Sequence, residues 1–78
     1  MSKTDEHTDP RIQQIAEKLK QLRLDAGYTS AENFAFDNEI NRVQYWRVEN
    51  GANITLKTLL KILDIHKITL QDFFNSLS

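Results

Sequence analysis

Apolar residues recur every three or four positions along most of the chain, with Gln, Glu, Lys and Arg between them. This spacing is typical of amphipathic helices, because positions three and four apart share one face of a helix. The first helix begins at Asp9-Pro10, where the Asp oxygen can accept unpaired N–H groups and Pro at the first helical position removes an N–H that has no partner. It ends at Gly27, which adopts the left-handed C-terminal conformation without strain. The pattern predicts about 16 helical residues, with the apolar positions Ile12, Ile15, Leu19, Leu22 and Ala26.

A short second helix is predicted to follow at once. Thr29 and Ser30 are both possible N-caps, so this helix begins near Ala31. The polar run at residues 37–39 interrupts the apolar pattern and ends the helix within two turns. Within that run we expect Asn38 to take the left-handed conformation that a tight turn between helices can require.

Three more helices complete the predicted domain. The third starts after Asn41, an N-cap with Gln44 at the reciprocal position, and ends at Asn50-Gly51. Thr55 caps the fourth helix, which is the most apolar segment and is expected to be the central buried helix. Thr69 caps a short fifth helix. Since no sequence long enough for a sheet strand alternates with a period of two, the predicted fold class is all-α.

Length and composition limit what the chain can be. Its 78 residues leave room for one small domain, and we assign residues 1–9 to a flexible N-terminal tail and residues 10–78 to the domain. The chain has no cysteine, which excludes disulfides, thiolate nucleophiles and sulfur-ligated zinc. No apolar run approaches the roughly 18 to 20 residues of a membrane span, and the acidic start is unlike a signal peptide. We expect a soluble cytoplasmic protein with no membrane partner.

The net charge of -1 at first argues against a polyanionic partner. However, residues 1–9 contain one Lys and three of the acidic residues, so nine basic and eight acidic residues remain in the rest of the chain. The balance is more positive still between Asn41 and Lys61, where four basic residues stand against one acidic residue. A local charge of this kind suits a surface that contacts nucleic acid. The residues are Arg42, Arg47, Lys57 and Lys61 against Glu49.

The order of helices and several short motifs indicate a family. The motifs are Gly27-Tyr28-Thr29-Ser30, Phe34-Ala35, Ile40-Asn41-Arg42, Val48-Glu49-Asn50-Gly51, Thr55, Thr58-Leu59-Leu60-Lys61 and the segment from Thr69 to Phe74. The chain resembles the lambda-repressor-like helix-turn-helix family of phage repressor, Cro and Xre-type bacterial regulators, over roughly Ile12 to Phe74. The resemblance implies a compact five-helix domain whose second and third helices form the helix-turn-helix.

The chain departs from the family pattern in the helix-turn-helix and after it. The segment from Gly27 to Glu49 is one residue longer than usual, and Ala31 replaces the usual Gln, which removes a side chain that clamps phosphate. In the turn, Asn38-Glu39 replaces an apolar-Gly pair, so we expect Phe36 to supply the missing apolar contact. At the end of the fourth helix, His66-Lys67 replaces Leu-Gly, so this helix is expected to end before Lys67.

The resemblance also assigns roles in DNA binding. Asn41, Arg42, Val43 and Arg47 would face base edges or phosphates. Arg pairs with two acceptors of guanine, Asn with the donor and acceptor of adenine, and Val43 could contact a thymine methyl group. Gln44 is either a capping partner or a phosphate donor, and the amide protons near Asn50 match a phosphate contact of the family. The candidate DNA-binding residues are Asn41, Arg42, Val43, Gln44, Trp46, Arg47, Asn50, Ser30 and Ala31.

Two features of the third helix concern its packing. The family pairs an Arg near the end of the first helix with a Glu at the end of the recognition helix, which here match Arg23 and Glu49, and we interpret this pair as structural. Trp46 could contact sugar and phosphate, or it could be a core or dimer aromatic. Tyr45 and Val48 are one turn apart and are assigned to the core.

We therefore expect a sequence-specific double-stranded DNA-binding transcriptional regulator, nucleoid-associated when bound to DNA. A homodimer is expected, because Phe73, Phe74 and Leu77 exceed what one short helix can bury, although Phe74 could merely close the core. The alternative is a protein-interaction module, such as the antitoxin component of a toxin-antitoxin pair or a non-DNA-binding adaptor.

Nothing in the sequence suggests catalysis or a bound cofactor. His7 and His66 are isolated, so no metal is predicted. The carboxylate pairs Asp37 with Glu39 and Asp25 with Glu17 lack the apolar pocket that would separate their pKa values. We expect no enzyme activity and no small-molecule cofactor.

Overall fold

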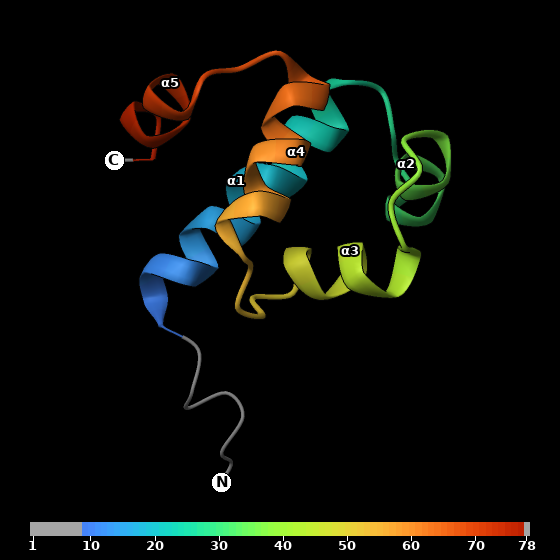
Figure 1. Ribbon diagram of the computed structural model, residues 1–78, viewed down its shortest axis with the longest axis horizontal. Coiled ribbons are helices and arrows are strands. Elements are labelled where there is room, and N and C mark those ends of the chain that lie inside the picture. Colours follow the sequence, from blue (N-terminus) through green and yellow to red (C-terminus); the bar gives the residue numbers. More distant parts are fainter. Residues whose placement is uncertain (1–8, 78) are drawn as a thin grey trace, which may run out of the picture.

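A computed structural model of the chain describes residues 9–77. Within these residues the structure has five helices and no strand, which confirms the all-α prediction. The predicted tail lies, apart from Asp9, outside the described residues, and so does His7. The helices are α1 (Pro10–Asp25), α2 (Ala31–Asp37), α3 (Arg42–Glu49), α4 (Leu56–His66) and α5 (Leu70–Asn75) (Figure 1).

Each helix begins at an N-cap residue that the sequence offered. In every case a side-chain oxygen accepts a backbone N–H of the first turn, which would otherwise have no partner in the helix. Of the two possible caps of α2, Ser30 is the one used, and its Oγ lies 3.1 Å from the backbone nitrogen of Asn33. The five N-caps are Asp9, Ser30, Asn41, Thr55 and Thr69.

Four helices end at a residue with a left-handed backbone. Two of these are Gly27 and Gly51, with φ of 96° and 87°, as the sequence predicts. The other two are Glu39 and Lys67, with φ of 59° and 58°. Since α4 ends at His66, it stops before Lys67 as expected.

The turn between α2 and α3 differs from the prediction. Asn38 has a φ of -105°, and the left-handed residue is Glu39, one position later. Two hydrogen bonds explain this shift, from the backbone N–H of Ile40 to the Ala35 carbonyl (2.8 Å) and from that of Glu39 to the Phe36 carbonyl (3.2 Å). This pair of bonds requires the left-handed residue at the second position after the helix. The expected contact from Phe36 is wrong, because its side chain is 82% exposed, and Ile40, at 8%, is the apolar residue of the turn.

All five helices contribute to one hydrophobic core. Tyr45 and Val48 are buried, as predicted. Helix α4 buries Leu59, Ile62 and Leu63 in this core, whereas its Leu56 and Leu60 are 64% and 42% exposed. These two lie one turn apart, on the edge of the helix beside the buried stripe. The core residues are Leu19 of α1, Phe34 and Ala35 of α2, Ile40, Tyr45 and Val48, Leu59, Ile62 and Leu63 of α4, and Phe73 of α5.

Phe34 lies at the centre of an aromatic cluster that joins α2 to α3 and α4. Its ring centroid is 5.2 Å from that of Tyr28, 5.0 Å from Tyr45 and 5.2 Å from His66. The His66 ring stacks on Phe34 at an interplanar angle of 6°. Its Nε2 atom is buried and has no hydrogen-bond partner among the described residues. Burial therefore lowers the pKa of His66 below its ordinary value of 6.5.

This environment predicts a pH-dependent stability. The unfolded chain protonates His66 near pH 6.5, whereas the folded chain resists protonation until a lower pH. The stabilisation is therefore complete above about pH 6.5 and is lost as the pH falls below it. Urea denaturation at pH 7.5 and at pH 5.5 measures the effect. In a His66→Phe variant, which keeps the stacked ring without a titrating group, we expect a smaller difference between the two pH values; an equal difference would contradict the prediction.

Candidate nucleic-acid interface

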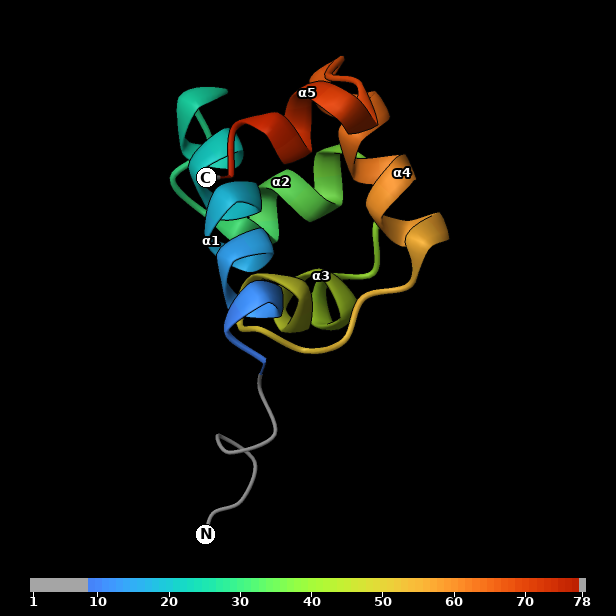
Figure 2. The same cartoon turned by 90° about the vertical axis from the view of Figure 1, so that its left-hand side faces the viewer.

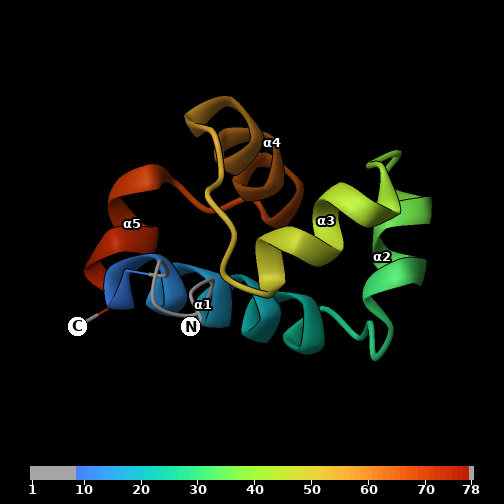
Figure 3. The same ribbon diagram turned by 90° about the horizontal axis from the view of Figure 1, so that it is seen from below.

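Helix α3 lies at one end of the molecule, and α5 lies at the other (Figure 2). Helix α3 packs against both α2 and α1, so one side of α3 is covered and its opposite side faces outward (Figure 3). Two polar contacts hold the preceding helix and turn in place. The Tyr28 hydroxyl donates to the Asp37 carboxylate (2.8 Å), and the Lys61 ammonium group donates to the Glu39 carbonyl (3.3 Å).

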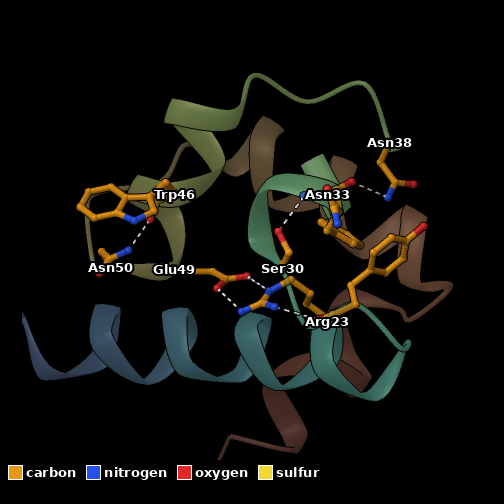
Figure 4. A network of polar contacts seen from close by, with 9 residues as sticks. Arg23, Ser30, Asn33, Asn38, Trp46, Glu49 and Asn50 are labelled. Atoms are coloured by element: carbon orange, nitrogen blue, oxygen red, sulfur yellow. Dashed lines mark hydrogen bonds and ion pairs between the residues drawn. The ribbon is translucent and has the colours of Figure 1, made fainter. Parts of the chain in front are cut away.

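A buried ion pair fixes the end of α3 against α1. Arg23 Nε lies 2.7 Å from Glu49 Oε2, and Arg23 Nη2 lies 3.0 Å from Glu49 Oε1 (Figure 4). The two side chains are only 5% and 6% exposed. A third bond runs from Arg23 Nη1 to the Tyr28 carbonyl (2.8 Å), and the hydrogen bond to Glu49 raises the pKa of the Arg23 guanidinium. The residues that the resemblance pairs thus lie in contact.

The Tyr45 hydroxyl lies near the same ion pair. It is buried and has no hydrogen-bond partner among the described residues. Burial, together with the neighbouring Glu49 carboxylate, raises the pKa of Tyr45 well above its ordinary range. The phenol therefore stays neutral beside the pair and does not disturb its charge balance.

The outward side of α3 carries most of the candidate DNA-binding residues. Val43 and Trp46 are 53% and 59% exposed, so the core interpretation of Trp46 is wrong. The physical reason is the helical repeat, since Tyr45, Val48 and Glu49 occupy the covered side and Trp46 falls outside that arc. We call this side the α3 surface; its residues, all exposed, are Arg42, Val43, Gln44, Trp46, Arg47 and Asn50.

Several candidate polar groups already have partners within the protein. The Asn41 amide oxygen accepts from the Gln44 backbone N–H (2.9 Å), and the side-chain nitrogen of Asn50 donates to the Trp46 carbonyl (2.7 Å; Figure 4). The backbone N–H of Asn50 donates to the Arg47 carbonyl (3.1 Å). The backbone N–H of Asn50 thus has a partner within the protein, and the phosphate contact near Asn50 stays a prediction.

Two grooves flank the α3 surface. One lies between α3 and the start of α2, has a volume of about 360 Å³, and is lined by Ala31, Glu32, Arg42, Val43 and Trp46. The other, of about 540 Å³, lies between α3 and the start of α4. Asn41, Gln44 and Arg47 line this second groove. Most of the candidate residues thus line one of the two grooves, and the two that line neither are Ser30, whose hydroxyl caps α2, and Asn50.

Glu32 was missed by the sequence reasoning. Its carboxylate forms an ion pair with the Arg42 guanidinium across the first groove. An acidic residue in the first turn of the second helix was the only available signal. That signal could not identify its partner, because the contact depends on the angle between α2 and α3.

The ion pair changes the charge of the site. Of the four basic residues between Asn41 and Lys61, Arg42 is paired with Glu32. Arg47 and Lys57 form no ion pair within residues 9–77. The Glu49 charge is taken up by Arg23. Among the residues of the α3 surface, Arg47 is therefore the basic side chain that forms no ion pair within residues 9–77.

The described part of the chain contains no group of three or more His, Cys, Asp or Glu residues that could hold a metal ion. No helix in residues 9–77 is both long enough and apolar enough to cross a membrane. Comparisons with protein-family models, curated proteins and solved structures returned no match.

Proposed function

We propose that the protein is a sequence-specific double-stranded DNA-binding transcriptional regulator with a lambda-repressor-like helix-turn-helix formed by α2 and α3. The observation that carries the proposal is the α3 surface, which presents hydrogen-bonding, basic and apolar side chains together on one exposed side of a helix. The eight residues of α3 span about 12 Å at 1.5 Å per residue. A helix with its side chains is about 10–12 Å in diameter, which fits a major groove about 12 Å wide.

In this proposal the residues of the α3 surface have different tasks. Arg47, which has no ion-pair partner within residues 9–77, reads guanine through its two acceptors, and Val43 contacts a thymine methyl group. Lys57 and Gln44 position the backbone through phosphate contacts, which carry no sequence information directly. Trp46 packs against sugar and phosphate beside them. The buried Arg23–Glu49 pair holds α3 at a fixed angle during binding.

Selection of bound sequences from a random pool of DNA duplexes tests the proposal. We expect an enriched motif, and recovery of no motif would refute the specific-reader function. The partner is expected to be a second copy of the chain, because Leu70 and Phe74 of α5 are 39% and 43% exposed and a dimer can bury them. A dimer with two-fold symmetry selects two inverted half-sites about one helical turn apart.

Replacing Arg47 by alanine is expected to weaken binding to the selected duplex by about 1–3 kcal/mol if Arg47 reads a base. Fluorescence anisotropy with a labelled duplex measures this loss. Arg11→Ala is the matched control, because it removes the same side chain from α1, where Arg11 is exposed and pairs with Asp9. Equal losses for the two variants would show that Arg47 contributes only general positive charge.

A protein-interaction module, such as an antitoxin component or an adaptor, is the second candidate. The observation that favours it is the exposure of large apolar side chains, with Phe36 at 82% and Trp46 at 59%. The dependence of affinity on salt concentration distinguishes the two functions, because affinity for DNA falls steeply as counterions compete for the phosphates. Tight association with a protein partner that persists in about 0.5 M salt, with no enriched DNA motif, would favour this candidate.

A further inference from the structure

The ion pair between Glu32 and Arg42 joins the first turns of α2 and α3 at the edge of the DNA-facing surface. We infer that Glu32 is a specificity-determining residue, which lowers the affinity for non-specific DNA by competing with phosphate for Arg42. This inference rests on the proposed DNA-binding function. Nothing in the family resemblance assigns a role to Glu32, whose acidic side chain faces the surface expected to meet a polyanion.

The Glu32–Arg42 ion pair contributes little to the stability of the fold. The two side chains are 69% and 60% exposed, and exposed ion pairs contribute little to stability. Glu32 is also not needed as a cap of α2, because the Asn33 backbone N–H is bonded to Ser30 Oγ (3.1 Å). As the acidic residue in the first turn of α2, Glu32 has at most a modest favourable interaction with the helix dipole, so the fold gives little reason for a carboxylate at the edge of the α3 surface.

The geometry leaves Arg42 able to hold Glu32 and a base together. Only Arg42 Nη1 donates to Glu32, and a guanidinium has five N–H donors in a planar fork. The remaining donors can approach the two acceptors of a guanine while the carboxylate holds the side chain in position. Glu32 itself can accept a hydrogen bond from the amino group of a cytosine.

A contact between Arg42 and a backbone phosphate breaks the ion pair with Glu32, whereas a contact with guanine keeps it. When Arg42 turns to a backbone phosphate, the contact with Glu32 is lost, and the carboxylate is left close to a second negative charge. Random DNA offers phosphates at every position, whereas a suitable base occurs only in some sequences. The Glu32 carboxylate therefore disfavours binding in which Arg42 contacts only the DNA backbone. Specificity for one DNA sequence over another can arise from such repulsion as well as from attraction.

Binding of the wild-type and Glu32→Gln proteins to two duplexes of equal length, the selected one and a random one, tests this inference. We expect Glu32→Gln to bind the random duplex about 3 to 10 times more tightly, and to lose a similar factor in the ratio of specific to non-specific affinity. Since Arg42 would gain one phosphate contact on random DNA, the dependence of log K on log salt should steepen by about 0.9 there. A simple structural role of Glu32 would not change this slope. Glu32→Asp, which keeps the charge, should restore part of the ratio.

Glu17→Gln is the matched control, because Glu17 is an exposed glutamate on the side of α1 that faces away from the core. Glu17→Gln removes the same charge from another helix, so it should change the affinity for both duplexes by the same factor. If Glu32→Gln also changes the affinity for both duplexes by the same factor, the inference is wrong while the proposed function stands. If the wild-type protein prefers no duplex, the proposed function fails, and the inference fails with it.

Discussion

Replacing Arg23 by methionine is expected to lower the free energy of unfolding by about 3–5 kcal/mol, because it leaves the Glu49 carboxylate buried without its partner. The Glu49 side chain is 6% exposed, and Arg23 supplies two of its hydrogen bonds. The substitution also removes the bond to the Tyr28 carbonyl. Methionine retains much of the volume of the arginine stem, so the loss of charge and hydrogen bonds dominates. Urea denaturation measures the change.

Two further variants separate the buried pair from general effects of losing an arginine. Arg11→Met breaks an ion pair with Asp9 in which the side chains are 84% and 38% exposed, so it should cost far less stability than Arg23→Met. In the double variant Arg23→Met with Glu49→Met, both charges are absent, and we expect much of the lost stability to return. The interpretation would be wrong if Arg23→Met cost no more than Arg11→Met, or if the double variant were as unstable as Arg23→Met.

The local features of the fold were predictable from the sequence. Caps depend on a side chain and the N–H groups two or three residues after it, so all the information lies in neighbouring positions. The same holds for Gly27 and Gly51, where glycine tolerates the left-handed backbone at little cost. Glu39 and Lys67 could not be identified in this way, because neither residue type favours that conformation. Their positions follow from the hydrogen bonds that close α2 and α4, and these depend on where the next segment packs.

Which residues of α3 are exposed was predictable from the sequence, but the contacts among the candidate site residues were not. The helical repeat separates Tyr45 and Val48 from the α3 surface, and the same repeat, applied to Trp46, would have placed it outside the core. The pairing of Arg42 with Glu32 is different, because it joins two helices and depends on the angle at which they pack. A local charge count between Asn41 and Lys61 cannot include an acidic residue that approaches from another helix.

Replacing Phe34 by alanine is expected to destabilise the protein by about 3–5 kcal/mol, the usual cost of removing a buried aromatic ring. Phe34 is 1% exposed and contacts the rings of Tyr28, Tyr45 and His66. The cavity would open where α2, α3 and α4 meet, so these helices cannot close it independently. A domain of this size has a total stability of roughly 4–12 kcal/mol, so the loss is a large share of that stability, and urea denaturation followed by circular dichroism measures it.

The same helix provides a matched control two residues later. Phe36→Ala removes an identical side chain that is 82% exposed, and such surface substitutions usually change stability by less than about 0.5 kcal/mol. If Phe34→Ala is too unstable for a denaturation curve, Phe34→Leu retains part of the buried volume and gives a smaller, measurable loss. Equal stabilities of Phe34→Ala and Phe36→Ala would mean that α2 is not held to the core through Phe34. A large loss confined to Phe34 would instead establish this ring as the anchor that sets the position of α2, and with it the groove in which Glu32 meets Arg42.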